Sequence, residues 1–162
     1  MDLILWRHAE AEEGSDDLAR ALTRKGQKQA REMATWLRQR LPADYRLLVS
    51  QAVRSEQTGA FLSRNFEVLP ALNPNTTPEA ALAALGWPNP NTDSSKQTVV
   101  LVGHQPYIGR LAALLLSGQD QFWSVKKGAI WWLDLRKSDE RLLDQNRLRV
   151  MMTTGMLHGE EH

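Results

Sequence analysis

Residues 3–12 read LILWRHAEAE, an apolar run that ends abruptly in an arginine, a histidine and two glutamates. A strand that helices cover on both faces reads as a continuous apolar run, so residues 3–6 predict a buried β-strand. Arg7 and His8 then lie at its carboxyl end. Because ligands of open α/β sheets bind outside the carboxyl ends of the strands, this stretch predicts both a fold and a site.

Length and composition limit what the chain does. Its 162 residues predict one domain over 1–162, with a frayed tail at 154–162. The 20 Lys and Arg against 19 Asp and Glu give a net charge of +1, so we expect neither nucleic acid nor a membrane as partner. The absence of cysteine excludes disulfides, thiolate metal sites and a cysteine nucleophile. With no secretory signal and no apolar run near the roughly 20 residues of a membrane span, we expect a cytoplasmic protein.

Strands and helices alternate along the rest of the chain. Apolar stretches predict further strands over residues 46–50, 98–103, 129–135 and 147–153, and the alternating stretch at 66–70 predicts an exposed or edge strand that stops at Pro70. Helical spacing predicts helices from the N-cap Thr23 to Leu41, over 53–64, over 79–85 and over 106–117. Polar and turn-forming residues predict loops over 9–22, 71–78 and 87–97. This order predicts an α/β fold, a three-layer α/β/α sandwich with a mostly parallel central sheet.

Polar reactive side chains follow three of the predicted strands. Arg7 and His8 follow the first, Arg54 comes one turn after the second, and His104 follows the strand at 98–103. Parallel strands bring these groups to one edge of the sheet, where a helix begins just after His104. Guanidinium groups and free backbone amides suit a tetrahedral dianion, so we predict a phosphate pocket. One of the two histidines can be the nucleophile and the other a stabilising donor.

Four segments, in order, resemble the motifs of the histidine phosphatase superfamily, which is also called phosphoglycerate mutase-like. They are RHAE at 7–10, RALTRKG at 20–26, SQAVRSEQT at 50–58 and GHQP at 103–106. Ala9 replaces the family glycine and Ser55 replaces its alanine. If position 9 requires a positive φ, alanine is strained there. The short chain and its small insertion between the second and fourth strands resemble the SixA-type phosphohistidine phosphatases.

The resemblance implies a mechanism and a set of site residues. His8 attacks phosphorus and is transiently phosphorylated, while Arg7, Arg54 and His104 stabilise the charge on the phosphoryl oxygens. Arg7, Arg54 and His104 also bind substrate. For Arg20 the sequence leaves two roles open, a salt bridge within the loop or a contact to substrate at the rim, and for Gln105 it predicts a helix cap that also reaches the phosphate. Neither a metal nor another cofactor is expected, because the cations already supply the positive charge.

The choice of substrate depends on the leaving group. An alkoxide requires a positioned general acid, whereas the imidazole of phosphohistidine leaves readily once it is protonated. The candidate acids are Glu10, Glu12, Glu56 and Glu79. With no evident acid-bearing insertion, the sequence favours a phosphohistidine protein as substrate, such as the histidine-containing phosphotransfer domain of a phosphorelay in signal transduction. The alternatives are a phosphatase of small phosphate esters and a non-catalytic module that binds phosphate or a partner.

Overall fold

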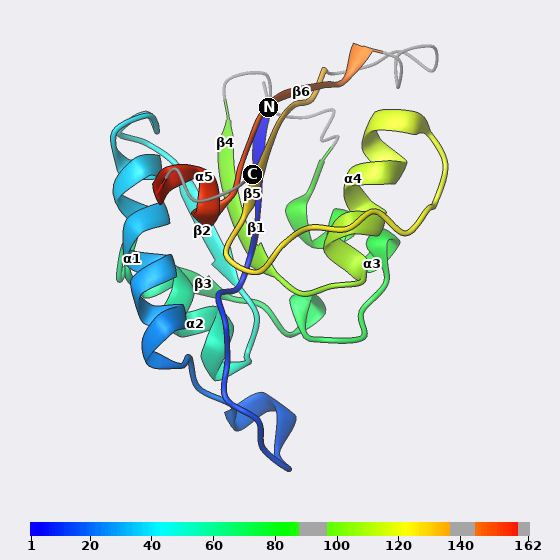
Figure 1. Ribbon diagram of the computed structural model, residues 1–162. Coiled ribbons are helices and arrows are strands. Elements are labelled where there is room, and N and C mark those ends of the chain that lie inside the picture. The colour runs from blue at the N-terminus through cyan, green and yellow to red at the C-terminus, as the bar shows by residue number, and fades with distance from the viewer. Residues whose placement is uncertain (88–96, 137–144, 159–162) are drawn as a thin grey trace.

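The computed structural model describes residues 1–87, 97–136 and 145–158. Within these ranges the chain forms a six-stranded sheet with the strand order β3-β2-β4-β1-β5-β6. Helices α1, α2 and α5 lie on one face of the sheet, and α3 and α4 lie on the other (Figure 1). The strands are β1 (Asp2–Arg7), β2 (Arg46–Val49), β3 (Glu67–Val68), β4 (Thr98–Gly103), β5 (Ile130–Asp134) and β6 (Arg147–Met152).

The sheet is mostly parallel, with two antiparallel pairings at one side. Strands β1 and β4, β4 and β2, and β2 and β3 pair in parallel, whereas β5 runs antiparallel to both β1 and β6. The predicted three-layer α/β fold with a mostly parallel sheet is therefore confirmed. In the register of the central pair Arg7 lies beside Gly103, so the histidines that follow these two residues leave the sheet side by side.

The central strand β1 is apolar because both of its faces are covered. Leu3 and Leu5 pack in the cluster beneath α3 and α4, while Ile4 and Trp6 pack in the cluster beneath α1. All four side chains are fully buried. This two-sided burial explains the uninterrupted apolar run and fixes the position of the residues that end the strand.

The helices begin and end at residues suited to those positions. They are α1 (Arg24–Arg38), α2 (Val53–Ala60), α3 (Pro78–Leu85), α4 (Tyr107–Ser117) and α5 (Thr154–His158). Thr23 caps α1 by accepting a hydrogen bond from the amide of Gly26 at 2.9 Å, as the sequence predicts. Gly86 and Gly118 end α3 and α4 with φ of 69° and 77°, the left-handed conformation that glycine adopts readily. None of the helices in the described ranges is both long and apolar enough to cross a membrane.

The chain departs from the sequence-based predictions at the ends of several elements and in the tail. Helix α1 ends at Arg38 and not at Leu41, and β3 covers only Glu67–Val68 of the strand predicted over 66–70. Helix α2 ends at Ala60, four residues before the predicted end. The frayed tail predicted from residue 154 is wrong for 154–158, which form α5. The side-chain oxygen of Thr153 accepts a hydrogen bond from the amide of Met156, and Leu157 packs against the cluster under α1, so the short helix is both capped and anchored. Residues 159–162 and most of the predicted loop at 87–97 lie outside the described residues.

Candidate active site

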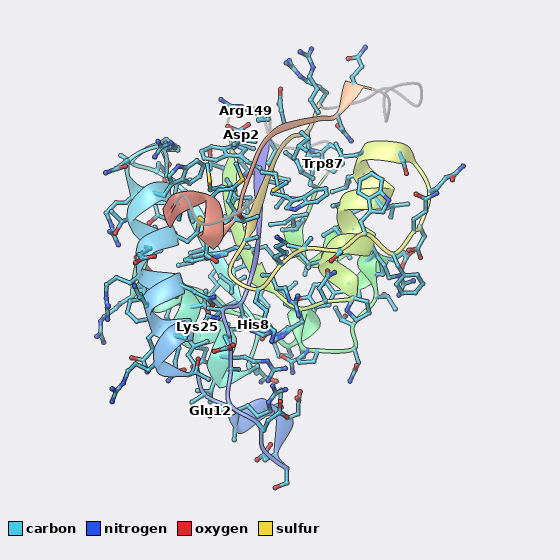
Figure 2. All side chains as sticks on the ribbon, in the orientation of Figure 1. Asp2, His8, Glu12, Lys25, Trp87 and Arg149 are labelled. Carbon is cyan, nitrogen blue, oxygen red and sulfur yellow. The ribbon has the colours of Figure 1, made fainter. Side chains whose placement is uncertain are left out.

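The carboxyl ends of β1, β2 and β4 open into a cleft of about 340 Å³. Figure 2 shows His8 where β1 leaves the sheet, at the end opposite Asp2. The structure brings together six of the residues singled out in the sequence, which are Arg7, His8, Arg20, Arg54, His104 and Gln105. The rest of the lining is Ala11, Glu13, Asp17, Pro74, Asn75 and Lys127.

His8 is held in one tautomer by the backbone that follows it. Its Nδ1 lies 2.7 Å from the carbonyl oxygen of Ala9, and because a carbonyl only accepts, Nδ1 carries the hydrogen. Nε2 of the neutral ring therefore keeps its lone pair. The pKa of His8 is lowered to about 4. Burial is the largest cause, the hydrogen bond to Ala9 opposes it, and the charges of Arg54 and Arg7 act in the same direction as burial. At neutral pH His8 is an unprotonated imidazole, the form in which histidine is a nucleophile.

His104 lies beside His8, with ring centroids 5.0 Å apart and planes tilted by 50°. Its Nε2 is 2.7 Å from the hydroxyl oxygen of Ser50, which also accepts a hydrogen bond from the amide of Ala52. Burial lowers the pKa of His104 to about 2, and the neighbouring His8 and Arg54 contribute in the same direction. Both rings are therefore neutral in the free protein at neutral pH.

The two arginines present donors that the protein leaves unpaired. Arg7 donates from one terminal nitrogen to the carbonyl of Val125 at 2.8 Å. The buried Nε atoms of Arg7 and Arg54 and the buried Nδ1 of His104 have no hydrogen-bond partner in the described part of the chain. Buried donors without partners are costly, and all three belong to residues that line the cleft. They fit an anion that has several acceptor oxygens, such as a phosphoryl group.

The SQAVRSEQT segment holds Arg54 and His104 through hydroxyl groups. The hydroxyl of Ser55 accepts from the amide of Ser50 and donates to the carbonyl of Val102 on β4, so α2 is tied to the sheet. The hydroxyl of Thr58 donates to the carbonyl of Arg54 and accepts from the amide of Ala9. Ser55, which replaces the family alanine, thus adds a link between the elements that carry the site.

Ala9 fits its position without strain. Among the described residues, Asn75 is the non-glycine residue with a positive φ, at 73°, and Ala9 is not one. The Ala9 side chain is fully buried and packs with Leu22 and Ala30. The strain that glycine would relieve is therefore absent at position 9.

Gln105 and Arg20 line the cleft, but the protein already uses their polar groups. The side-chain oxygen of Gln105 accepts from the amide of Gly109 at 2.8 Å, and its nitrogen donates to the carbonyl of Trp123 at 2.9 Å. Arg20 donates to the carbonyl of Glu12 at 2.7 Å and to the Asp17 carboxylate at 3.0 Å. Gln105 is thus placed to position the start of α4, and Arg20 to hold the loop after β1.

None of the four glutamates considered as general acids lines the cleft. Glu10 accepts a hydrogen bond from the Thr23 hydroxyl at 2.8 Å, at the start of α1. Glu12 is exposed on the segment beyond His8 (Figure 2), Glu56 is partly exposed on α2, and Glu79 is exposed in the first turn of α3.

The acidic side chains that line the cleft are Glu13 and Asp17, which the sequence-based reasoning did not select. Lys127, from the segment before β5, also lines it. The signal for the two acids is weak, since both belong to a stretch with no periodicity in which acidic residues are frequent. No group of three or more His, Asp or Glu side chains in the described ranges is arranged to hold a metal ion.

Comparison with known proteins agrees with this geometry. No protein-family model matches the chain. It is 33% identical over 129 residues to the phosphohistidine phosphatase SixA of Escherichia coli (strain K12), covering 74% of this chain and 76% of that protein. The structure of the protein histidine phosphatase SixA complexed with tungstate superposes with a TM-score of 0.80 at 28% identity, over 97% of this chain and 99% of that one. The SixA protein of Nakamurella multipartitia gives 0.75 at 26% identity, over 93% and 94%.

The fold and the cleft together define a phosphatase of the histidine phosphatase superfamily, the class that the sequence motifs predict. Relatives in that superfamily differ in their substrates, so the class alone does not name one. Within it, the chain belongs to the SixA family.

Proposed function

We propose that the protein is a metal-independent phosphohistidine phosphatase that works through a phosphorylated His8. The observation that carries the proposal is the neutral His8 ring, whose Nδ1–H is held by the Ala9 carbonyl while Nε2 is free to attack. Nε2 forms a bond to phosphorus as the bond from phosphorus to the substrate nitrogen breaks. Water then attacks the phosphohistidine, releasing inorganic phosphate and restoring His8.

Arg7, Arg54 and His104 stabilise the phosphoryl group during both transfers. The charge of the transferring group spreads over its three equatorial oxygens, and fixed donors stabilise it without reorganisation. The unpaired Nε atoms of Arg7 and Arg54 supply two such donors. When the Ser50 hydroxyl donates to Nε2 of His104, the hydrogen of that neutral ring is on Nδ1, and Nδ1 becomes a third donor.

The ionised state of the Asp17 carboxylate supports a substrate whose leaving group needs no proton from the enzyme. Hydrogen bonds from Arg54, with a smaller contribution from Arg20, hold the pKa of Asp17 below its usual value, so this carboxylate is ionised and has no proton to donate. An alkoxide leaving group would require such a proton, whereas a substrate imidazole that solvent protonates does not. We therefore propose a phosphohistidine protein as substrate, with the histidine-containing phosphotransfer domain of a cytoplasmic phosphorelay as its specific form. The relative from Escherichia coli is itself named a phosphohistidine phosphatase.

Intact mass measured without acid, together with turnover of several substrates, tests this proposal. We expect the protein to gain the mass of one phosphoryl group transiently, and to release phosphate from a phosphorylated phosphotransfer domain faster than from sugar phosphates. His8→Ala should abolish both results, whereas Glu56→Gln, whose side chain does not line the cleft, should retain them. A chelator should leave the rate unchanged.

Faster hydrolysis of sugar phosphates would favour the small-ester alternative. Absence of both turnover and the mass gain would favour a binding module. Loss of turnover in chelator that is restored by added metal would contradict metal independence.

A further inference from the structure

Asp17 contacts the two arginines on the loop side of the cleft. Its carboxylate accepts a hydrogen bond from a terminal nitrogen of Arg54 at 3.1 Å and another from Arg20 at 3.0 Å. The backbone carbonyl of Asp17 accepts from the other terminal nitrogen of Arg54. Both terminal nitrogens of Arg54 are therefore bonded to one residue, which lies in the short 3-10 helix η1 (Asp17–Ala19).

The two partners differ in how firmly they are held. The Arg54 side chain is 5% exposed and its backbone is tied to the sheet through α2, whereas the Asp17 side chain is 54% exposed and belongs to the loop after β1. When the pair breaks, water readily solvates the Asp17 carboxylate, while the Arg54 guanidinium stays in the cleft. Asp17 is thus the partner that moves.

A phosphoryl group and Asp17 compete for the terminal nitrogens of Arg54. Arginine binds phosphate bidentately through the fork of donors that Asp17 engages here. The carboxylate is also a negative charge at the edge of a cleft that must accept a dianion, so it opposes binding even where the donors are shared. The unpaired Nε of Arg54 can donate to a phosphoryl group while Asp17 stays in place. A bidentate contact also uses a terminal nitrogen, and there the phosphoryl group has to compete with the carboxylate or the carbonyl of Asp17.

We propose that Asp17 is an internal competitor for the phosphoryl group and thereby a specificity-determining residue, an inference that rests on the proposed function. A phosphoprotein contacts the enzyme beyond its phosphoryl group, and this binding energy offsets the displacement of Asp17. Inorganic phosphate and small esters lack those contacts, so Asp17 disfavours them. The same competition promotes release of the phosphate product.

The test compares Asp17→Asn with wild type, and Asp16→Asn serves as the matched control. Both variants remove one negative charge from the same exposed loop. The Asp16 side chain makes no capping hydrogen bond to η1, so its replacement tests the loss of charge alone. Asparagine keeps the shape of Asp17 and an acceptor oxygen, so a role in orienting Arg54 is largely retained. Calorimetry measures binding of inorganic phosphate and of tungstate at low salt, and circular dichroism verifies folding, with Asp17→Ser as a second variant.

We expect Asp17→Asn to bind both anions on the order of tenfold more tightly, and Asp16→Asn to match wild type. In turnover assays Asp17→Asn should increase kcat/KM for small phosphoryl donors more than for the phosphoprotein. Weaker or unchanged anion binding in Asp17→Asn, or equal tightening in Asp16→Asn, would overturn the proposal. Anion binding is read without turnover, so a failure of the proposed substrate is distinguished from a failure of this inference.

Discussion

Acidification from pH 7 to pH 4.5 should destabilise the protein through its two active-site histidines. The folded-state pKa of His8 is about 4, below the ordinary value of 6.5, because the ring is buried and lies near two guanidinium groups. The unfolded chain therefore binds more protons between these two values, and the free energy of unfolding falls as the pH falls through this window. The pKa of His104 is displaced in the same direction.

The magnitude for His8 follows from the displacement of its pKa. A difference of one unit corresponds to about 1.4 kcal/mol, so a pKa lowered to about 4 gives a maximum loss of roughly 3 kcal/mol. Most of this loss, roughly 2 kcal/mol, occurs by pH 4.5. The His8 side chain is buried, at 8% exposure, so solvent screening reduces the effect little. Small domains are stable by about 5–15 kcal/mol, which makes the loss easy to measure.

Urea denaturation followed by far-ultraviolet circular dichroism, at pH steps between 7 and 4.5, measures the effect. The informative quantity is the free energy of unfolding of wild type minus that of His8→Asn, because groups common to both proteins largely cancel. This difference should fall by roughly 2 kcal/mol as the pH is lowered. Asp17, whose pKa lies below its usual value, loses its contribution at lower pH and stays outside the window. A difference that is constant with pH would refute the reasoning.

Three further outcomes follow from the site. Ser50→Ala removes the hydrogen-bond partner of His104 Nε2. We expect steady-state kinetics to show a fall in kcat by one to two orders of magnitude, and urea denaturation to show a loss of about 1–3 kcal/mol in the free energy of unfolding. Gly109→Ala places a Cβ 1.8 Å from the carbonyl oxygen of Trp123, so the segment that carries Trp123 and the Val125 carbonyl bonded to Arg7 has to shift. Urea denaturation should show a loss of about 1–3 kcal/mol in the free energy of unfolding. Unchanged stability would contradict this packing. Tungstate binding near pH 6 should take up protons, because a dianion raises the pKa of both active-site histidines; equal calorimetric heats in buffers of different ionisation enthalpy would argue against it.

Much of the fold is predictable because burial leaves a pattern in the sequence. Strands β1 and β4 are covered on both faces, so they read as unbroken apolar runs, and the reactive side chains come directly after them. Once the strands are taken as parallel, the position of His8 beside His104 follows from the pairing of β1 with β4. The position of Arg54 follows from the first turn of α2.

The loop after β1 could not be predicted in the same way. Its acidic residues have no periodicity, and Asp17 meets Arg54 across 37 residues of sequence, through a contact that the tertiary fold creates. Helix α5 was missed for a related reason, because five residues are too few to show a helical repeat and are held by the Thr153 cap and the burial of Leu157. Local propensity carries little information where long-range contacts decide the structure.

The choice of acid shows most clearly why proximity in sequence is a poor guide to chemistry. Glu10 is two residues from the proposed nucleophile, yet its carboxylate accepts a hydrogen bond from Thr23 at the start of α1. Asp17 is nine residues away in sequence and lines the cleft, but the arginine that we propose binds the phosphoryl group keeps this carboxylate ionised. A carboxylate in that state competes for the phosphate site and has no proton for a leaving group. The same ion pair therefore disfavours small esters twice, once in binding and once in the cleavage step. A phosphohistidine protein offsets the binding cost through its wider contacts and avoids the need for a proton donor through its imidazole leaving group.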